Sequence, residues 1–168
     1  MALVFIGIGS SIDREDNIRS GIQALQNTFG TLQQSPVYES EAVGFKGGNF
    51  YNMVVSFSSE LDVTAVIDKL KTIEIQQGRP SKTIKYAPRT LDLDILLYDH
   101  VIDPEIDLPR AEIIKNAFVL QPLSELAPQL KHPISQKTYQ SLWDQFPKQQ
   151  QKLWQIDVPF IQITTKKR

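Results

Sequence analysis

The chain has 168 residues, of which 41% are hydrophobic and 22% charged, and its formal net charge is −1. These values are typical of one folded domain with a sizeable core and exclude a disordered chain, while the near-neutral charge argues against a broad surface for nucleic acid or anionic membranes. The absence of cysteine excludes disulfides, thiolate metal sites and cysteine nucleophiles.

The first part of the chain alternates strand and helix patterns. Ala2–Ile8 is almost continuously apolar, as expected of a central strand; it lacks the basic leader of a signal peptide, and no apolar run approaches the ~20 residues of a membrane span. A cytoplasmic protein is therefore expected. A helix follows, with apolar residues at helical spacing before a terminating glycine: Ile18, Ile22, Leu25, Phe29 and Gly30. Residues 32–40 and Phe50–Phe57 are predicted strands, separated by the glycine-containing loop Glu41–Asn49.

A second helix and a further strand complete the pattern. Asp62 is expected to cap a helix that ends before Gly78, the basic loop Arg79–Arg89 follows, and Thr90–Tyr98 is a strong strand. The order strand, helix, strand, strand, helix, strand is the ferredoxin-like βαββαβ arrangement of the α+β class. We therefore expect a mixed or antiparallel sheet with helices on one face and the other face free for loops and ligand.

The remaining residues, about 99–168, are predicted to form a C-terminal α/β extension of the core at about 1–98. Short helical segments are expected around Phe118–Leu126 and Thr138–Phe146. The whole chain, 1–168, is expected to be a single domain.

The strongest candidate for chemistry is the pair Asp92 and Asp94 in the predicted strand Thr90–Tyr98. Residues two apart in a strand share a face, so the two carboxylates should lie roughly 5–7 Å apart. At an effective dielectric of about 20, their repulsion amounts to about 2–3 kcal/mol. A divalent cation would offset it, and with only two histidines in the chain a hard ion such as magnesium is favoured. The alternative is that both side chains simply face water.

The loop before this strand concentrates positive charge: no acidic residue lies between Glu74 and Asp92, whereas the loop holds Arg79, Lys82, Lys85 and Arg89. Charge runs are usually solvated. Here the loop leads directly into paired carboxylates, and cations beside a metal are the recurring arrangement of phosphoryl transfer. The phosphate-binding G-x-x-x-x-G-K-[ST] motif is absent.

Other candidate residues give weaker signals. Phe50 and Asn52 can stack on a flat heterocycle and hydrogen-bond its edge, although aromatic residues in strands more often belong to the core. Glu74 by itself suggests a surface ion pair with Lys71, and Phe118 by itself suggests a core residue.

Pro88–Tyr98 (Pro-Arg-Thr-Leu-Asp-Leu-Asp-Ile-Leu-Leu-Tyr) strongly resembles the signature of 6-hydroxymethyl-7,8-dihydropterin pyrophosphokinases of folate synthesis. Further segments match the same family in register: Ile6–Ser10, Gly44, Phe50–Asn52, Ile73–Arg79 and Phe118–Leu123. The matches span about residues 3–130 in the expected order. The resemblance implies transfer of the β,γ-pyrophosphate of ATP to the pterin hydroxymethyl group, leaving AMP.

The resemblance also implies roles for individual residues. Asp92 and Asp94 would hold two magnesium ions, and Arg79 and Arg89 would act on the phosphates. The ATP site would include Lys71, Glu74, Lys82, Tyr86, Arg89, Ile95 and Arg110. The pterin site would include Ser40, Val43, Gly44, Phe50, Asn52 and Phe118. The partners would be small molecules only, and the protein a monomer.

The chain departs from the family pattern at Ser81, Ala87, Arg110 and Asn116, all in the ATP-binding periphery. Two other hypotheses therefore remain beside the active enzyme. One is a silent paralogue that binds pterin or nucleotide, against which the retained aspartate pair argues. The other, ranked lowest, is an RNA-binding sheet, which would need exposed aromatic residues and a basic face.

Overall fold

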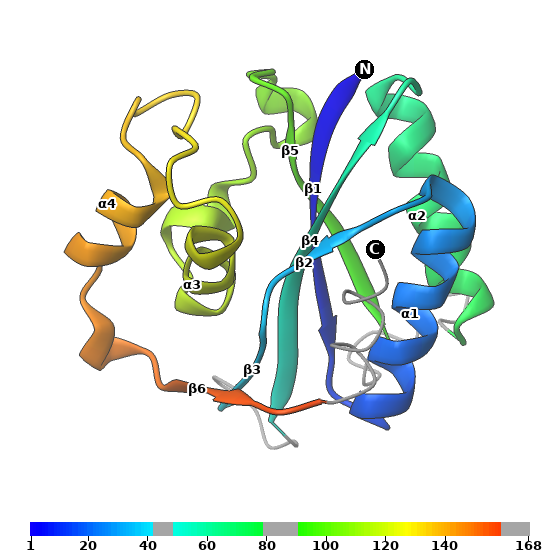
Figure 1. Ribbon diagram of the computed structural model, residues 1–168, viewed down its shortest axis with the longest axis horizontal. Helices are drawn as coiled ribbons and strands as arrows, with labels where there is room; N and C mark the ends of the chain where they lie inside the picture. The colour runs from blue at the N-terminus through cyan, green and yellow to red at the C-terminus, as the bar shows by residue number, and fades with distance from the viewer. Residues whose placement is uncertain (42–48, 79–90, 159–168) are drawn as a thin grey trace.

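The structure, a computed structural model, describes residues 1–41, 49–78 and 91–158. Its centre is an antiparallel six-stranded sheet in the order β5-β1-β4-β3-β6, with β2 paired to β4 (Figure 1). The strands are β1 (Ala2–Ser10), β2 (Gln33–Gln34), β3 (Val37–Ser40), β4 (Phe50–Ser59), β5 (Asp92–Tyr98) and β6 (Leu153–Ile156). The predicted ferredoxin-like order of strands and helices is confirmed for the core.

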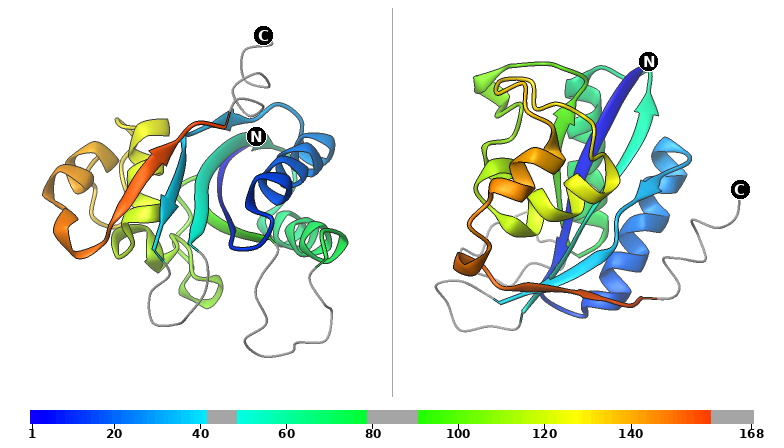
Figure 2. Two further views of the ribbon diagram at one scale, coloured as in Figure 1. Left: turned by 90° about the horizontal axis from the view of Figure 1, so that it is seen from below. Right: turned by 60° about the vertical axis from the view of Figure 1, so that its left-hand side comes forward.

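Helices lie on both faces of the sheet. On one face are α1 (Arg14–Phe29) and α2 (Val63–Gln76), and on the other are α3 (Ala117–Leu126) and α4 (Tyr139–Gln145) (Figures 1 and 2). The described residues also form the short 3₁₀ helices η1 (Pro104–Ile106), η2 (Ala111–Ile114) and η3 (Lys148–Gln150). Within the described residues, no helix is long and apolar enough to cross a membrane.

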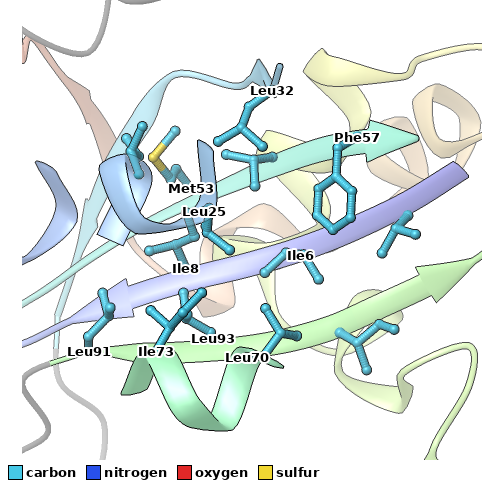
Figure 3. Packing of buried hydrophobic residues seen from close by; sticks show 14 of the residues in the cluster. Ile6, Ile8, Leu25, Leu32, Met53, Phe57, Leu70, Ile73, Leu91 and Leu93 are labelled. Carbon is cyan, nitrogen blue, oxygen red and sulfur yellow. The ribbon is translucent and has the colours of Figure 1, made fainter. Parts of the chain in front are cut away.

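The larger core lies between the sheet and the pair α1 and α2. Figure 3 shows Ile6 and Ile8 of β1 meeting Leu25 of α1 and Leu70 and Ile73 of α2. Both helices end as predicted, because Gly30 and Gly78 adopt φ angles of 90° and 101° that only glycine adopts without strain. The Asp62 side chain accepts the predicted capping hydrogen bond, from the Ala65 N–H at 2.8 Å.

The expectation of a second face free for loops and ligand is wrong for the part of that face that carries Phe5, Val54 and Leu96. Phe5, Val54 and Leu96 are apolar residues on it, and leaving them in water would be costly. The C-terminal region covers them with a second core that includes Ile113, Val119, Leu120, Leu123 and Tyr139. Among the described residues, the end of this face beyond Phe5, around Gly7 and Gly9, stays open as a pocket.

Two strand predictions also differ in detail. The strand expected over residues 32–40 is interrupted at Ser35 and Pro36, because Ser35 exchanges hydrogen bonds with Val54 and proline has no N–H to donate. β6 was not predicted, since its four residues carry no clear alternation of their own.

His132, to which the sequence assigned no role, is a structural residue. It is only 5% exposed, and its Nδ1 accepts hydrogen bonds from the N–H groups of Ile134 and Ser135 at 3.2 and 3.3 Å. Burial lowers the pKa of its imidazole, and the two donors also favour the neutral ring. The unfolded chain therefore binds a proton more readily than the folded protein does.

His132 is expected to make the protein less stable in mild acid. Because its folded pKa lies below the unfolded value of 6.5, its contribution is present above that pH and is lost as the pH falls through the folded pKa. Urea unfolding of the wild type, His132→Asn and the exposed control His100→Asn at about pH 7 and about pH 5 measures this. Asparagine can accept the same bonds without titrating, so only H132N should flatten the pH dependence; parallel losses in all three proteins would contradict the assignment.

Candidate active site

The two aspartates of β5 face the open end of the second sheet face. In the register of the sheet, Asp92 lies opposite Gly9 of β1 and Asp94 lies opposite Gly7. The alternating residues Leu91, Leu93 and Ile95 are buried in the core on the other side, with 0%, 5% and 7% exposure. The predicted sharing of one face by the two carboxylates is confirmed.

This open end is a cavity of about 260 Å³. Its volume lies near the lower end of small-molecule pockets, so it suits one small ring system. The residues that line it come from β1, β3 and the residue after it, β4, β5, η2 and α3: Gly7, Ile8, Gly9, Ser40, Glu41, Phe50, Asn52, Met53, Val54, Asp92, Asp94, Leu96, Glu112, Phe118 and Val119.

Glycines form the floor of the cavity. Gly9 lies between Asp92 on one neighbouring strand and Asn52 on the other, and a Cβ atom on it would be 2.9 Å from Asn52 Oδ1. At Gly7 the atoms nearest to a Cβ atom would be those of the Leu96 side chain, at 3.4 Å and beyond. The absence of side chains at these positions leaves the space between the carboxylates and Asn52 open.

Four residues predicted for the pterin site lie around this cavity. Ser40 pairs with Phe50 across β3 and β4, and the Asn52 Nδ2 donates to Ser40 Oγ at 3.5 Å. Phe118, the second residue of α3, is half-buried and lines the cavity rather than lying wholly in the core. A flat ring entering here meets an aromatic side chain from β4 and another from α3. Val43 and Gly44, also predicted here, lie outside the described residues.

Arg110 brings a positive charge to the carboxylates. Its Nη2 lies 3.6 Å from Asp94 Oδ2, its Nε donates to Glu112 Oε1 at 3.0 Å, and its Nη1 lies 3.8 Å from Asp107 Oδ2. Burial lowers the pKa of the guanidinium, but the three carboxylates raise it by more, so the pKa ends above its usual value. Arg110 therefore stays charged beside Asp94.

Comparison with known proteins identifies the family. The sequence model of 7,8-dihydro-6-hydroxymethylpterin-pyrophosphokinase (HPPK) matches residues 5–128. This chain belongs to the HPPK family. The 2-amino-4-hydroxy-6-hydroxymethyldihydropteridine pyrophosphokinase of Aquifex aeolicus is 38% identical over 141 residues, which cover 82% of this chain and 88% of the relative. The enzyme of the same name from Pseudomonas aeruginosa is 35% identical over 139 residues, covering 77% and 83%.

Solved structures support the fold. The crystal structure of an HPPK-DHPS in complex with substrates superposes with a TM-score of 0.67 at 11% identity, over 85% of this chain and 42% of that one. Wild-type HPPK-DHPS of Plasmodium falciparum superposes with a TM-score of 0.64 at 13% identity, over 85% and 44%. This HPPK-family chain thus matches less than half the length of those proteins, and at such identities the likeness concerns the fold alone.

Three residues expected at the ATP site, Lys71, Glu74 and Ile95, do not line the cavity. Lys71 is exposed on α2, and Ile95 is buried in the core between the sheet and α2. The surface position suggested for Glu74 is wrong: its side chain is 7% exposed, and its Oε2 accepts a hydrogen bond from the Leu93 N–H at 2.7 Å. Through this hydrogen bond Glu74 connects α2 to β5 at Leu93, the residue between Asp92 and Asp94. Periodicity gave no signal for this contact, which joins residues 19 apart.

Replacing Glu74 by methionine is expected to destabilise this HPPK-family protein by about 2 kcal/mol, because the buried Leu93 N–H loses its acceptor. Glu74→Gln keeps an acceptor oxygen and should cost less than half as much. Urea unfolding of both variants and of the exposed control Glu60→Gln measures the difference. Equal losses for methionine and glutamine would mean that the charge of Glu74, not its hydrogen bond, stabilises the fold.

The carboxylates of Asp92 and Asp94 suit a metal ion whose remaining ligands come from water and a phosphate substrate. In residues 1–41, 49–78 and 91–158 no group of three or more His, Cys, Asp or Glu side chains is arranged to hold a metal ion. A carboxylate pair fits Mg²⁺ nonetheless, because Mg²⁺ usually takes one or two protein carboxylates and completes its sphere with water and substrate phosphates. Arg79, Lys82, Tyr86 and Arg89, the remaining residues predicted for phosphate or ATP, lie outside the described residues.

Proposed function

We propose that this protein transfers the pyrophosphoryl group of ATP to the hydroxymethyl group of 6-hydroxymethyl-7,8-dihydropterin and releases AMP, a step of folate biosynthesis. One observation carries the proposal: the carboxylates of Asp92 and Asp94 open into the same cavity as Phe50, Asn52 and Phe118. The cavity suits a flat heterocycle, and the two carboxylates would hold a metal-bound polyphosphate that approaches it.

The pterin ring would lie between Phe50 and Phe118. Aromatic side chains on both sides of a flat ring give large contact areas and favourable stacking. The amide of Asn52 supplies both a donor and an acceptor, which suits the mixed pattern along a pterin edge, and Ser40 holds this amide in place. Val43 and Gly44 would complete this pocket. With the ring so placed, the hydroxymethyl group points toward the carboxylates.

The carboxylates would serve the phosphate side of the reaction. Asp92 and Asp94 would hold magnesium, and the family resemblance implies two ions. Bound magnesium would neutralise phosphate charge and lower the pKa of the attacking hydroxyl. The pterin hydroxyl oxygen forms a bond to the β-phosphorus of ATP as the bond from that phosphorus to the α,β-bridging oxygen breaks. AMP leaves with that oxygen, and the hydroxyl proton is released to solvent.

Cations of the chain would position the phosphates for this in-line displacement. Arg110 already stands beside Asp94 and can turn toward an entering phosphate oxygen. Arg79, Arg89 and Lys82 would add further positive charges. The rest of the ATP site would be formed by Tyr86, Lys71, Glu74 and Ile95. We propose that the protein works as a cytoplasmic monomer, as one domain over residues 1–168, without nucleic acid or membrane.

Incubation of the purified protein with ATP, magnesium and 6-hydroxymethyl-7,8-dihydropterin tests the proposal, with nucleotide products separated by chromatography. AMP that forms only when the pterin is present is the expected result. Pterin binding without AMP would instead indicate a silent binding protein. Absence of both AMP formation and pterin binding would overturn the substrate assignment.

A further inference from the structure

The C-terminal segment Gln151–Ile156 contacts both walls of the cavity, although it lies beyond residue 128, where the family match ends. Its strand β6 forms the edge of the sheet beside β3 (Figures 1 and 2). In this pairing Leu153 lies opposite Ser40 and Trp154 lies opposite Glu39. The segment thus reaches the β3 and β4 wall of the cavity through the backbone of Ser40 itself.

The start of this segment is attached to the other wall. Gln151 Oε1 accepts a hydrogen bond from the Ala117 N–H at 2.7 Å, and its Nε2 donates to the Lys115 carbonyl at 2.8 Å. The N-cap residue of α3, Asn116, makes no side-chain capping bond. The side chain of Gln151 therefore caps the N-terminus of α3 at Ala117, the residue before Phe118, although it lies 34 residues further along the chain.

Trp154 attaches the segment to a polar cluster centred on Glu39. The Trp154 Nε1 donates to Glu39 Oε1 at 3.2 Å, while Oε2 of the same carboxylate accepts from Asn49 Nδ2 at 3.0 Å and pairs with Arg14 at 3.3 Å. Arg14 also donates to the Asn49 carbonyl at 3.0 Å. Asn49 directly precedes Phe50, and Glu39 directly precedes Ser40. By holding Asn49 and Glu39, this cluster restrains the backbone at the two cavity residues that follow them.

We propose that Gln151–Trp154 is a strap that sets the separation between the two aromatic walls of the pterin site, Phe118 on α3 and Phe50 on β4, and so determines pterin affinity. Gln151 and Trp154 act as positioning residues, since neither lines the cavity. A ring between two aromatic side chains must touch both, and a shift of ~1 Å in either wall loses much of the dispersion contact. The inference rests on the proposed function and assigns a part in it to the C-terminal region.

Binding measurements on Gln151→Met and Trp154→Phe test the strap. Methionine keeps the length of the side chain without its amide, and phenylalanine keeps a ring without the indole N–H. Pterin affinity is followed by pterin fluorescence, magnesium–ATP affinity by calorimetry, and folding by thermal melting. Each variant is expected to weaken pterin binding about fivefold to tenfold and to change ATP binding by less than about twofold. Gln151→Glu, which keeps the acceptor for Ala117, should give an intermediate pterin affinity.

The matched control is Gln140→Met, because Gln140 is exposed on α4 and its Nε2 donates only to Asp144 among the described residues. Unchanged pterin affinity in folded Q151M and W154F would overturn the strap and leave the proposed function intact. Loss of pterin and ATP binding in step with the melting temperature, or failure of both variants to fold, would show a general stabilising role and also overturn it. A wild type that binds no pterin would overturn the proposed function itself.

Discussion

Asp92→Asn and Asp94→Asn are each expected to reduce AMP formation by at least about a thousandfold, because a neutral amide binds magnesium poorly and the phosphate charge is then not offset. Both side chains line the cavity at a strand surface, so the fold should survive. Removing one of the two negative charges relieves their repulsion, whereas Asp94→Asn also gives up the ion pair with Arg110 at 3.6 Å, so stability in metal-free buffer should change by no more than about 1 kcal/mol. Single-turnover measurement of AMP at saturating ATP and pterin gives the effect on the transfer step.

A second measurement separates metal binding from catalysis. Magnesium in the presence of a non-hydrolysable ATP analogue should raise the melting temperature of the wild type and of the exposed control Asp68→Asn, but much less that of the two variants. Full AMP formation by either variant would remove its aspartate from the proposed machinery. Lost activity with an unchanged magnesium response would mean that the residue acts on the substrate without holding the metal.

Much of this site follows from short-range patterns in the sequence. Alternation in Thr90–Tyr98 predicts that Asp92 and Asp94 share a face, and their register against Gly9 and Gly7 of β1 agrees. The spacing of apolar residues predicts α1 and α2, and the terminal glycines predict where they end. Periodicity and capping are properties of neighbouring residues, so the sequence displays them directly.

The contacts that the sequence did not reveal join residues far apart in the chain. Trp154 meets Glu39 across 115 residues, and Glu74 reaches the backbone of Leu93 from the neighbouring helix. A buried glutamate and an exposed one look alike in a helical pattern, because only the tertiary partner decides which it is. The packing of the C-terminal region on Phe5, Val54 and Leu96 was not predicted for a related reason. Apolar residues on the second face indicate that something packs there, but they do not indicate which segment it is.

The glycines of β1 are an intermediate case. The motif Ile6–Ser10 contributed to the family resemblance, yet its spacing alone assigned no role to Gly7 or Gly9. Glycine within a strand is unfavourable unless something approaches closely, so two glycines on one face are a signal of a cavity or ligand. The structure identifies this cavity as the one at the candidate active site, because Gly9 lies between Asp92 and Asn52 in the sheet.

Gly9→Ala is accordingly expected to weaken pterin binding by at least about tenfold. Its new Cβ atom would lie 2.9 Å from Asn52 Oδ1, closer than such contacts occur, so the Asn52 amide has to turn away from the position that Ser40 supports. The ring edge then loses its donor and acceptor, and the methyl group occupies part of the floor of the cavity. Pterin fluorescence titration measures the loss.

Gly7→Ala is the matched control, because it adds the same methyl group on the same face of the same strand. There the Cβ atom meets the apolar side chain of Leu96 at 3.4 Å, which is ordinary van der Waals contact. The methyl group takes some of the cavity floor but leaves the Asn52 amide in place, so pterin affinity should fall clearly less than in Gly9→Ala, and the pair of variants separates the effect on Asn52 from any general cost of replacing glycine in β1. Similar losses in the two variants would place the pterin elsewhere on this face, nearer to Leu96 than to Asn52.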